Sequence, residues 1–201
     1  MKALLLKDTY VIWKQMKIFL IIILVFSAIP SGFNSAFAVI YAAMMPYTAI
    51  AYDERSKWDQ MAAMMPYSPR DIVLGKYVFG WLCIAAAMVL SALFQGLLSF
   101  LGASLSLALL AMSALSGLCV LAITLPVMFR FGVEKGRLAM FLIIFLVCGT
   151  AGGISSITIS EGSGAAFAVQ NLLLLILLVA AVVLTAVSVP LSMRFYRERM
   201  G

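Results

Sequence analysis

The sequence predicts an all-α polytopic membrane protein with six transmembrane helices and both termini in the cytoplasm. Of its 201 residues, 65% are hydrophobic and only 11% are charged, less than half of the roughly 25% typical of soluble domains. All 14 Lys and Arg residues fall in four clusters, at residues 2–17, 55–76, 130–137 and 194–199. Keeping every cluster on the cytoplasmic side requires each stretch between clusters to cross the membrane and return, which gives three hairpins.

Residues 2–17 are expected to form an amphipathic helix lying in the plane of the inner membrane surface. One side carries polar side chains at seven-residue spacing: Lys7, Asp8, Lys14 and Gln15. The opposing side carries an apolar stripe: Leu6, Tyr10, Trp13 and Met16. Basic side chains facing anionic headgroups, with a Trp at the interface, are typical of such a helix. The alternative is that this segment is the charged extension of the first span.

The remaining chain divides at its turn residues into paired spans. Residues 18–52 hold spans 1 and 2, separated by the turn sequence Pro30-Ser31-Gly32. Residues 69–129 hold spans 3 and 4, and residues 130–137 form an inner loop. Residues 138–193 hold spans 5 and 6, with Glu161 at the outer surface between them. Residues 194–201 form a cytoplasmic tail, so that residues 1–201 make a single transmembrane domain.

Residues 53–68 are the polar segment between spans 2 and 3. Its first half is predicted as a short amphipathic helix from Asp53, with an apolar stripe along one side. Asp53 and Lys57 are four residues apart, a spacing at which opposite charges on a helix attract each other. The stripe consists of Trp58, Met61, Ala62 and Met65. Pro66 ends the helix, because proline has no N–H to donate.

A second helix begins directly after it with clear capping signals. Ser68 is the expected N-cap, Pro69 the first helical residue, and Asp71 completes a capping box. Nothing interrupts the helical pattern for some thirty residues, or about 45 Å, which exceeds the roughly 30 Å hydrocarbon core. The third span is therefore expected to project into the cytoplasm, carrying Arg70, Asp71 and Lys76. The short helix and this projecting start of the third span together predict a rigid docking surface. The alternative is that residues 53–76 are only a solvated loop.

Several kinds of chemistry are excluded by the residues present. The chain has no His, so imidazole-based metal or acid–base sites are impossible. Gly75-Lys76-Tyr77 lacks the first glycine and the hydroxyl residue of a phosphate-binding loop. The adjacent Asp53 and Glu54 point about 100° apart on a helix and form no paired acid–base site. We expect no catalytic residues, no metal and no cofactor in this chain.

The distribution of charged residues indicates which partners the chain binds and where the energy for any transport comes from. The net charge of +6 is explained by membrane orientation, because the basic residues flank apolar runs, and no nucleic acid is expected. The predicted spans contain no ionisable residue of the kind that ion-driven carriers use. Energy for any transport would therefore come from outside the chain.

Three stretches of the sequence resemble a known family. Met-Lys-Ala-Leu-Leu-Leu-Lys-Asp opens the chain, Tyr-Asp-Glu-Arg-Ser-Lys-Trp-Asp begins at residue 52, and Pro-Tyr-Ser-Pro-Arg-Asp-Ile-Val-Leu-Gly-Lys-Tyr ends at residue 77. The chain resembles the small ABC-2 type permeases of bacterial ABC exporters. Within them it is most similar to those that export amphipathic peptides such as phenol-soluble modulins.

 The resemblance implies a homodimer of permeases in the bacterial cell (plasma) membrane, in which neither copy is catalytic, and one ABC ATPase subunit docks beneath each copy. ATP and Mg would be bound by that ATPase and not by this chain.

The resemblance also implies which residues couple the two subunits. The segment from Asp53 would be a coupling helix that docks on the ATPase, with Trp58 and the methionines in its groove and the charges fixing its orientation. The candidate coupling residues are Asp53, Glu54, Arg55, Lys57, Trp58, Met61, Met65, Pro66, Arg70 and Asp71. Lys76 and Tyr77 also match the motif, whereas Tyr67 and Pro69 depart from it.

These patterns together predict the permease subunit of an exporter that moves an amphipathic peptide or lipid-like substrate outward, using ATP hydrolysed by a separate ATPase. Two other hypotheses remain open from the sequence. The first is a membrane scaffold or immunity-type protein that binds a partner without transport. The second is an intramembrane enzyme, which would need a catalytic set that the sequence does not offer.

Overall fold

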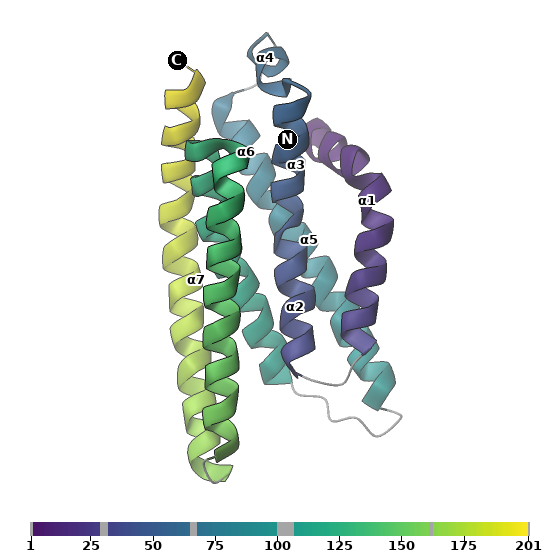
Figure 1. Cartoon of the computed structure of the whole chain (residues 1–201), viewed down its shortest axis with the longest axis vertical. Coiled ribbons are helices and arrows are strands. Elements are labelled where there is room, and N and C mark those ends of the chain that lie inside the picture. Colours follow the sequence, from purple (N-terminus) through teal and green to yellow (C-terminus); the bar gives the residue numbers. More distant parts are fainter. Residues whose placement is uncertain (1, 29–31, 65–67, 100–106, 161–162, 201) are drawn as a thin grey trace.

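The computed structural model describes residues 2–28, 32–64, 68–99, 107–160 and 163–200, and in these ranges the chain is almost entirely helical. The long helices lie side by side as a bundle (Figure 1). They are α1 Lys2–Ala28, α2 Gly32–Ala43, α3 Met45–Arg55, α4 Trp58–Ala63, α5 Pro69–Ser99, α6 Leu107–Ser160 and α7 Ser163–Met200. The predicted all-α class is confirmed for these residues.

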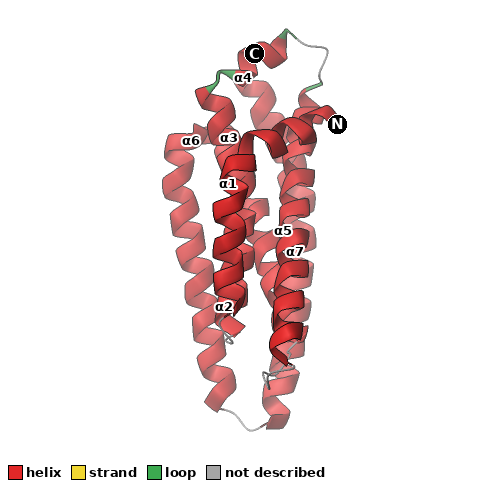
Figure 2. Ribbon diagram, turned by 90° about the vertical axis from the view of Figure 1, so that its right-hand side faces the viewer, coloured by secondary structure: helices red, strands yellow, loops and turns green. Residues whose placement is uncertain are grey.

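One end of the bundle gathers the features that matter for function. The short helix α4 lies there, and both chain termini lie toward the same end (Figures 1 and 2). The first turns of α1 run across this end before the helix turns along the bundle. We call it the α4 end.

Three described stretches are long and apolar enough to cross a membrane: Pro69–Leu97, Leu110–Phe145 and Asn171–Glu198. The stretch in α7 is the least buried within the bundle, as expected for a helix whose surface faces lipid. These stretches establish the membrane class. Glu161, expected at the outer surface, lies outside the described residues.

The predicted start of the third span is confirmed. α5 begins at Pro69, and the Ser68 hydroxyl oxygen accepts a hydrogen bond from the Arg70 backbone N–H at 3.2 Å. The 31 residues of α5 correspond to about 46 Å of helix. This length exceeds the roughly 30 Å thickness of a hydrocarbon core.

The second predicted span contains a helix break that the sequence pattern did not predict. α2 ends at Ala43 and α3 begins at Met45, with Met44 between them. Pro46 explains the break, because it has no N–H to bond to the carbonyl oxygen four residues earlier. α2 and α3 nevertheless continue in the same direction along the bundle (Figure 1).

The helix predicted to run from Asp53 to Met65 is wrong as a single element. α3 continues to Arg55, and α4 begins only at Trp58. Lys57 lies between them with a φ of 52°, a left-handed conformation that no α-helix contains. The predicted pair between Asp53 and Lys57 is also wrong, because the Asp53 carboxylate pairs with Lys7 and Lys76.

Close helix packing depends on small residues, as is usual in membranes. At Gly80 in α5, an added Cβ would lie 2.1 Å from Leu121 Cδ1 and 2.9 Å from Pro46 Cγ. This glycine therefore lets α5 approach both α6 and the break in the second predicted span.

Candidate functional site

Four charged side chains from three helices meet at the α4 end, and we call them the charge cluster: Lys7, Asp8, Asp53 and Lys76. The Lys76 ammonium lies 2.8 Å from Asp8 Oδ1 and 2.6 Å from Asp53 Oδ2. The Lys7 ammonium contacts the other oxygen of Asp53 and lies 3.4 Å from Asp8 Oδ1. Each cation thus bridges both carboxylates.

The charge cluster is shielded from solvent. Asp8, Lys76 and Asp53 are 3%, 5% and 8% exposed. Two positive and two negative charges balance, which is the condition under which buried charges are tolerated. The cluster therefore fixes the relative positions of α1, α3 and α5.

The predicted orientation of the first helix is wrong at this point. Lys7 and Asp8 were expected to face headgroups, but they point into the bundle, whereas Leu6 and Tyr10 are 64% and 81% exposed. The physical reason is that Lys7 and Asp8 have partners of opposite charge inside the bundle, and these stabilise charges that are shielded from water. The side chains of Trp13, Lys14, Gln15 and Met16 lie outside the described residues.

Lys7 also connects the charge cluster to α4. Its ammonium lies 4.0 Å from the centroid of the Trp58 ring, a cation–π contact. Trp58 is half-buried and packs against the hydrophobic core. One side chain of α1 thus touches both the first residue of α4 and the carboxylate of Asp53.

Two methionines are exposed in the α4 region, beside the exposed polar Gln60. Met61 is 47% exposed, and Met64, directly after the helix, is 89% exposed. An unbroken helical spacing from Trp58 predicts Met65 on this side in place of Met64. Met65 and Pro66 lie outside the described residues.

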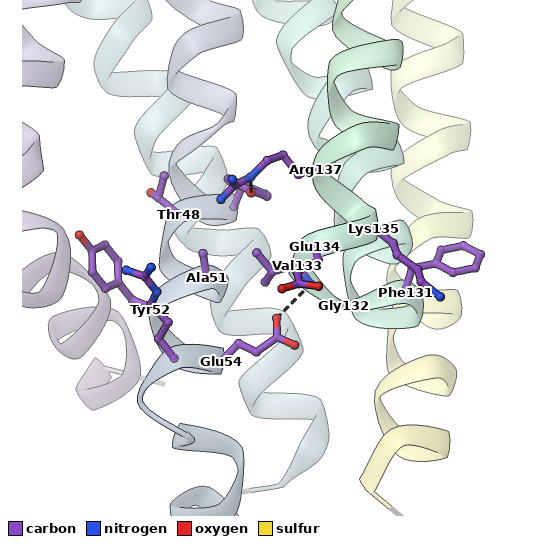
Figure 3. A pocket seen from close by; sticks show the side chains of 12 residues that line it. Thr48, Ala51, Tyr52, Glu54, Phe131, Gly132, Val133, Glu134, Lys135 and Arg137 are labelled. Carbon is purple, nitrogen blue, oxygen red and sulfur yellow. Dashed lines mark hydrogen bonds between the residues drawn. The ribbon is translucent and has the colours of Figure 1, made fainter.

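The other candidate coupling residues lie around this region. Arg55 and Lys57 are exposed between α3 and α4, Arg70 is exposed in the first turn of α5, and Asp71 is half-buried. Glu54 turns away from its neighbour Asp53. Its Oε2 accepts a hydrogen bond from the Val133 backbone N–H at 3.0 Å (Figure 3).

The contact of Glu54 lies at a break within α6. Gly132 has a φ of 77° and a ψ of 179°, a conformation essentially restricted to glycine. The segment 130–137, expected as a loop, is helical on both sides of this residue. The Glu54 carboxylate thus holds α3 against the start of the second half of α6.

Tyr77, which the family motif includes, lies deeper in the bundle. Its hydroxyl group pairs with Ser188 and lies 2.8 Å from the Ser192 hydroxyl. Ser188 also donates to the Ala122 carbonyl oxygen at 2.5 Å. These hydrogen bonds join α5, α6 and α7 and satisfy polar groups that would be costly to bury alone.

Comparison with known proteins identifies the family. The family model for ABC-2 family transporter proteins matches residues 3–197. The chain belongs to this family. It is a membrane subunit of an ABC transporter, and membership implies an ABC ATPase as its partner. No curated protein and no solved structure matches the chain.

The described residues offer no cluster of three or more His, Cys, Asp and Glu side chains that could hold a metal ion. In the described residues the site is thus a short helix with two methionines exposed at or beside it, which is connected through Lys7 to balanced charges between three longer helices.

Proposed function

We propose that this ABC-2 family protein is the permease subunit of an exporter, acting as a homodimer with one ATPase docked beneath each copy. The proposed six spans are α1, α2 with α3, α5, the two halves of α6, and α7. Both termini and α4 lie at the same end of the bundle (Figures 1 and 2), which supports a cytoplasmic location for all three.

The observation that carries the proposal is the contact between Lys7 and Trp58 at the inner side of α4. A partner that binds Met61 and Met64 would press on a helix whose first residue is already attached to the charge cluster. Movement of α4 would then reach α1 and α5 through Lys7 and Lys76. ATP and Mg, bound by the ATPase, would drive this movement between inward-open and outward-open packings.

The proposed substrate is an amphipathic peptide or lipid-like molecule that leaves toward the outside. The resemblance supports this class, as does the absence of charged residues between Tyr77 and Phe129, which leaves largely apolar surfaces in spans 3 and 4. The proposed location is the bacterial cell membrane.

The docking step is tested by co-purification with an ABC ATPase; an ATPase reading frame adjacent to that of this chain would itself favour the exporter over the scaffold. Met61→Ala combined with Met64→Ala should lower ATPase recovery about tenfold, since two buried methionine contacts contribute more than about 1.4 kcal/mol. Leu175→Ala is the control, because Leu175 is an exposed apolar residue (61%) of another helix, α7. Unchanged recovery with both methionines replaced would remove the docking surface.

Transmission is tested separately with Trp58→Ala. Because Trp58 is half-buried and faces Lys7, its loss should reduce ATP-dependent peptide uptake into inverted vesicles more than it reduces ATPase recovery. Equal loss of both would assign Trp58 to docking alone. Partner binding without any uptake of peptides or lipids would favour the non-transporting scaffold.

A further inference from the structure

A cavity of about 770 Å³ lies on another side of α3, between this helix and the Gly132 break of α6 (Figure 3). Charged residues of both signs line it: Glu54, Arg55, Glu134, Lys135 and Arg137. The cavity lies near the α4 end, where the basic clusters of the sequence also lie. This is the level at which lipid headgroups meet a membrane protein.

Arg137 is the best-positioned cation of the cavity. Its Nε donates a hydrogen bond to the Tyr47 hydroxyl oxygen at 2.9 Å, and Figure 3 shows its side chain reaching toward α3. This bond uses one of the five N–H donors of the guanidinium and orients the others. Lys135 lines the cavity as well.

The charges of the cavity favour an anion. Three cations stand against two carboxylates, and the Glu54 carboxylate already accepts the Val133 N–H. Glu134 lies three residues before Arg137 on the same helix and lowers the net attraction without cancelling it. A planar guanidinium that is held by one edge is suited to a phosphate group.

An apolar stripe begins directly beside Arg137. Leu138, Phe141, Leu142 and Phe145 are 75%, 58%, 67% and 83% exposed. Their spacing places them on one face of the helix over about 10 Å. Because Phe141 follows Arg137 by four residues, the guanidinium stands at the head of this stripe.

We propose that the cavity binds the phosphate of an anionic phospholipid from the leaflet at the α4 end, with its acyl chain along the stripe. Arg137 is the principal ligand of the phosphate, and Arg55 approaches from α3. The combination of a cationic head position with an adjoining apolar stripe matches a lipid better than a soluble anion. This binding does not depend on the ATPase or on transport, so it can fail while the proposed function holds, and the reverse.

The test uses the full chain in vesicles that contain phosphatidylglycerol and phosphatidylcholine, followed by native mass spectrometry of the lipid retained after extraction. The wild-type chain should retain phosphatidylglycerol about tenfold over phosphatidylcholine, and Arg137→Gln should remove this preference. Arg130→Gln, which removes the same charge from an exposed α6 residue that lies against the Phe131 and Phe195 rings and does not line the cavity, should keep it. Equal loss in both variants would indicate diffuse surface attraction and overturn the site.

Further measurements distinguish a lipid from the other possible occupants of the site, a free anion and a second copy of the chain. Excess inorganic phosphate should leave phosphatidylglycerol bound, and its displacement would assign the site to a free anion. Disulfide-linked dimers of Phe141→Cys, absent from the wild-type chain, would assign the stripe to a second copy. If Arg137→Gln does not fold, Tyr47→Phe carries the test: the preference should fall about threefold, and an unchanged preference would overturn the proposal.

Discussion

Asp53 and Glu54 are neighbours in the sequence, yet they hold together two very different junctions at the α4 end. Asp53 enters a buried cluster, in which its carboxylate contacts two cations from other helices, Lys7 of α1 and Lys76 of α5. Glu54, exposed overall, accepts one backbone N–H beside an open cavity. The two side chains point about 100° apart on α3. This difference alone places one carboxylate in a buried ion-pair cluster and the other at a contact beside an open cavity.

The largest effect is expected from breaking the charge cluster. Lys76→Met leaves Asp8 and Asp53 with one cation between them, and removing one partner of a buried ion pair costs about 3–5 kcal/mol. The free energy of unfolding, measured in detergent with denaturant, should fall by this amount. Adding Asp8→Asn should restore part of it, since charges balance again.

The control for this prediction is an exposed pair. Arg194 Nε lies 3.1 Å from Glu198 Oε1, with side chains 77% and 60% exposed. Arg194→Ala should change the free energy of unfolding by no more than about 0.5 kcal/mol. A loss as large as that of Lys76→Met would show that burial is not what distinguishes the two sites.

An intermediate effect is expected at the break in α6. Gly132→Ala forces a side chain into a glycine conformation, at a cost of about 1–3 kcal/mol, and places a Cβ 3.3 Å from Glu54 Oε1. Thermal unfolding of the purified chain measures the loss. Gly96→Ala is the control, because a Cβ there meets no atom within 4 Å; equal effects would contradict the strain.

The smallest effect is expected at Glu54. Glu54→Ala removes the acceptor of the Val133 N–H and should cost about 1 kcal/mol. Glu54→Gln keeps an acceptor oxygen and should cost less. Hydrogen exchange at the Val133 amide measures the change directly; unaltered protection in Glu54→Ala would show that this bond does not hold the junction.

The start of α5 was predictable because its signals are local. Ser68, Pro69 and the uninterrupted pattern that follows specify a helix through neighbouring residues alone. The position of the α4 helix was only half predictable. The apolar spacing indicated a helix here, but the left-handed conformation of Lys57 delays its beginning to Trp58. Met64 is therefore the exposed methionine after this helix, where the spacing predicted Met65.

The sequence by itself determined the membrane class, the helical content and the family, because composition, charge clusters and motifs are properties of the chain as written. Only the tertiary structure decided which charges are buried. Lys76 meets Asp53 from 23 residues away and Asp8 from 68, and no local pattern encodes such distances. The physical reason is that a buried charge is stabilised by its partners in space, so the inward orientation of Lys7 and Asp8 follows from the packing of α1, α3 and α5.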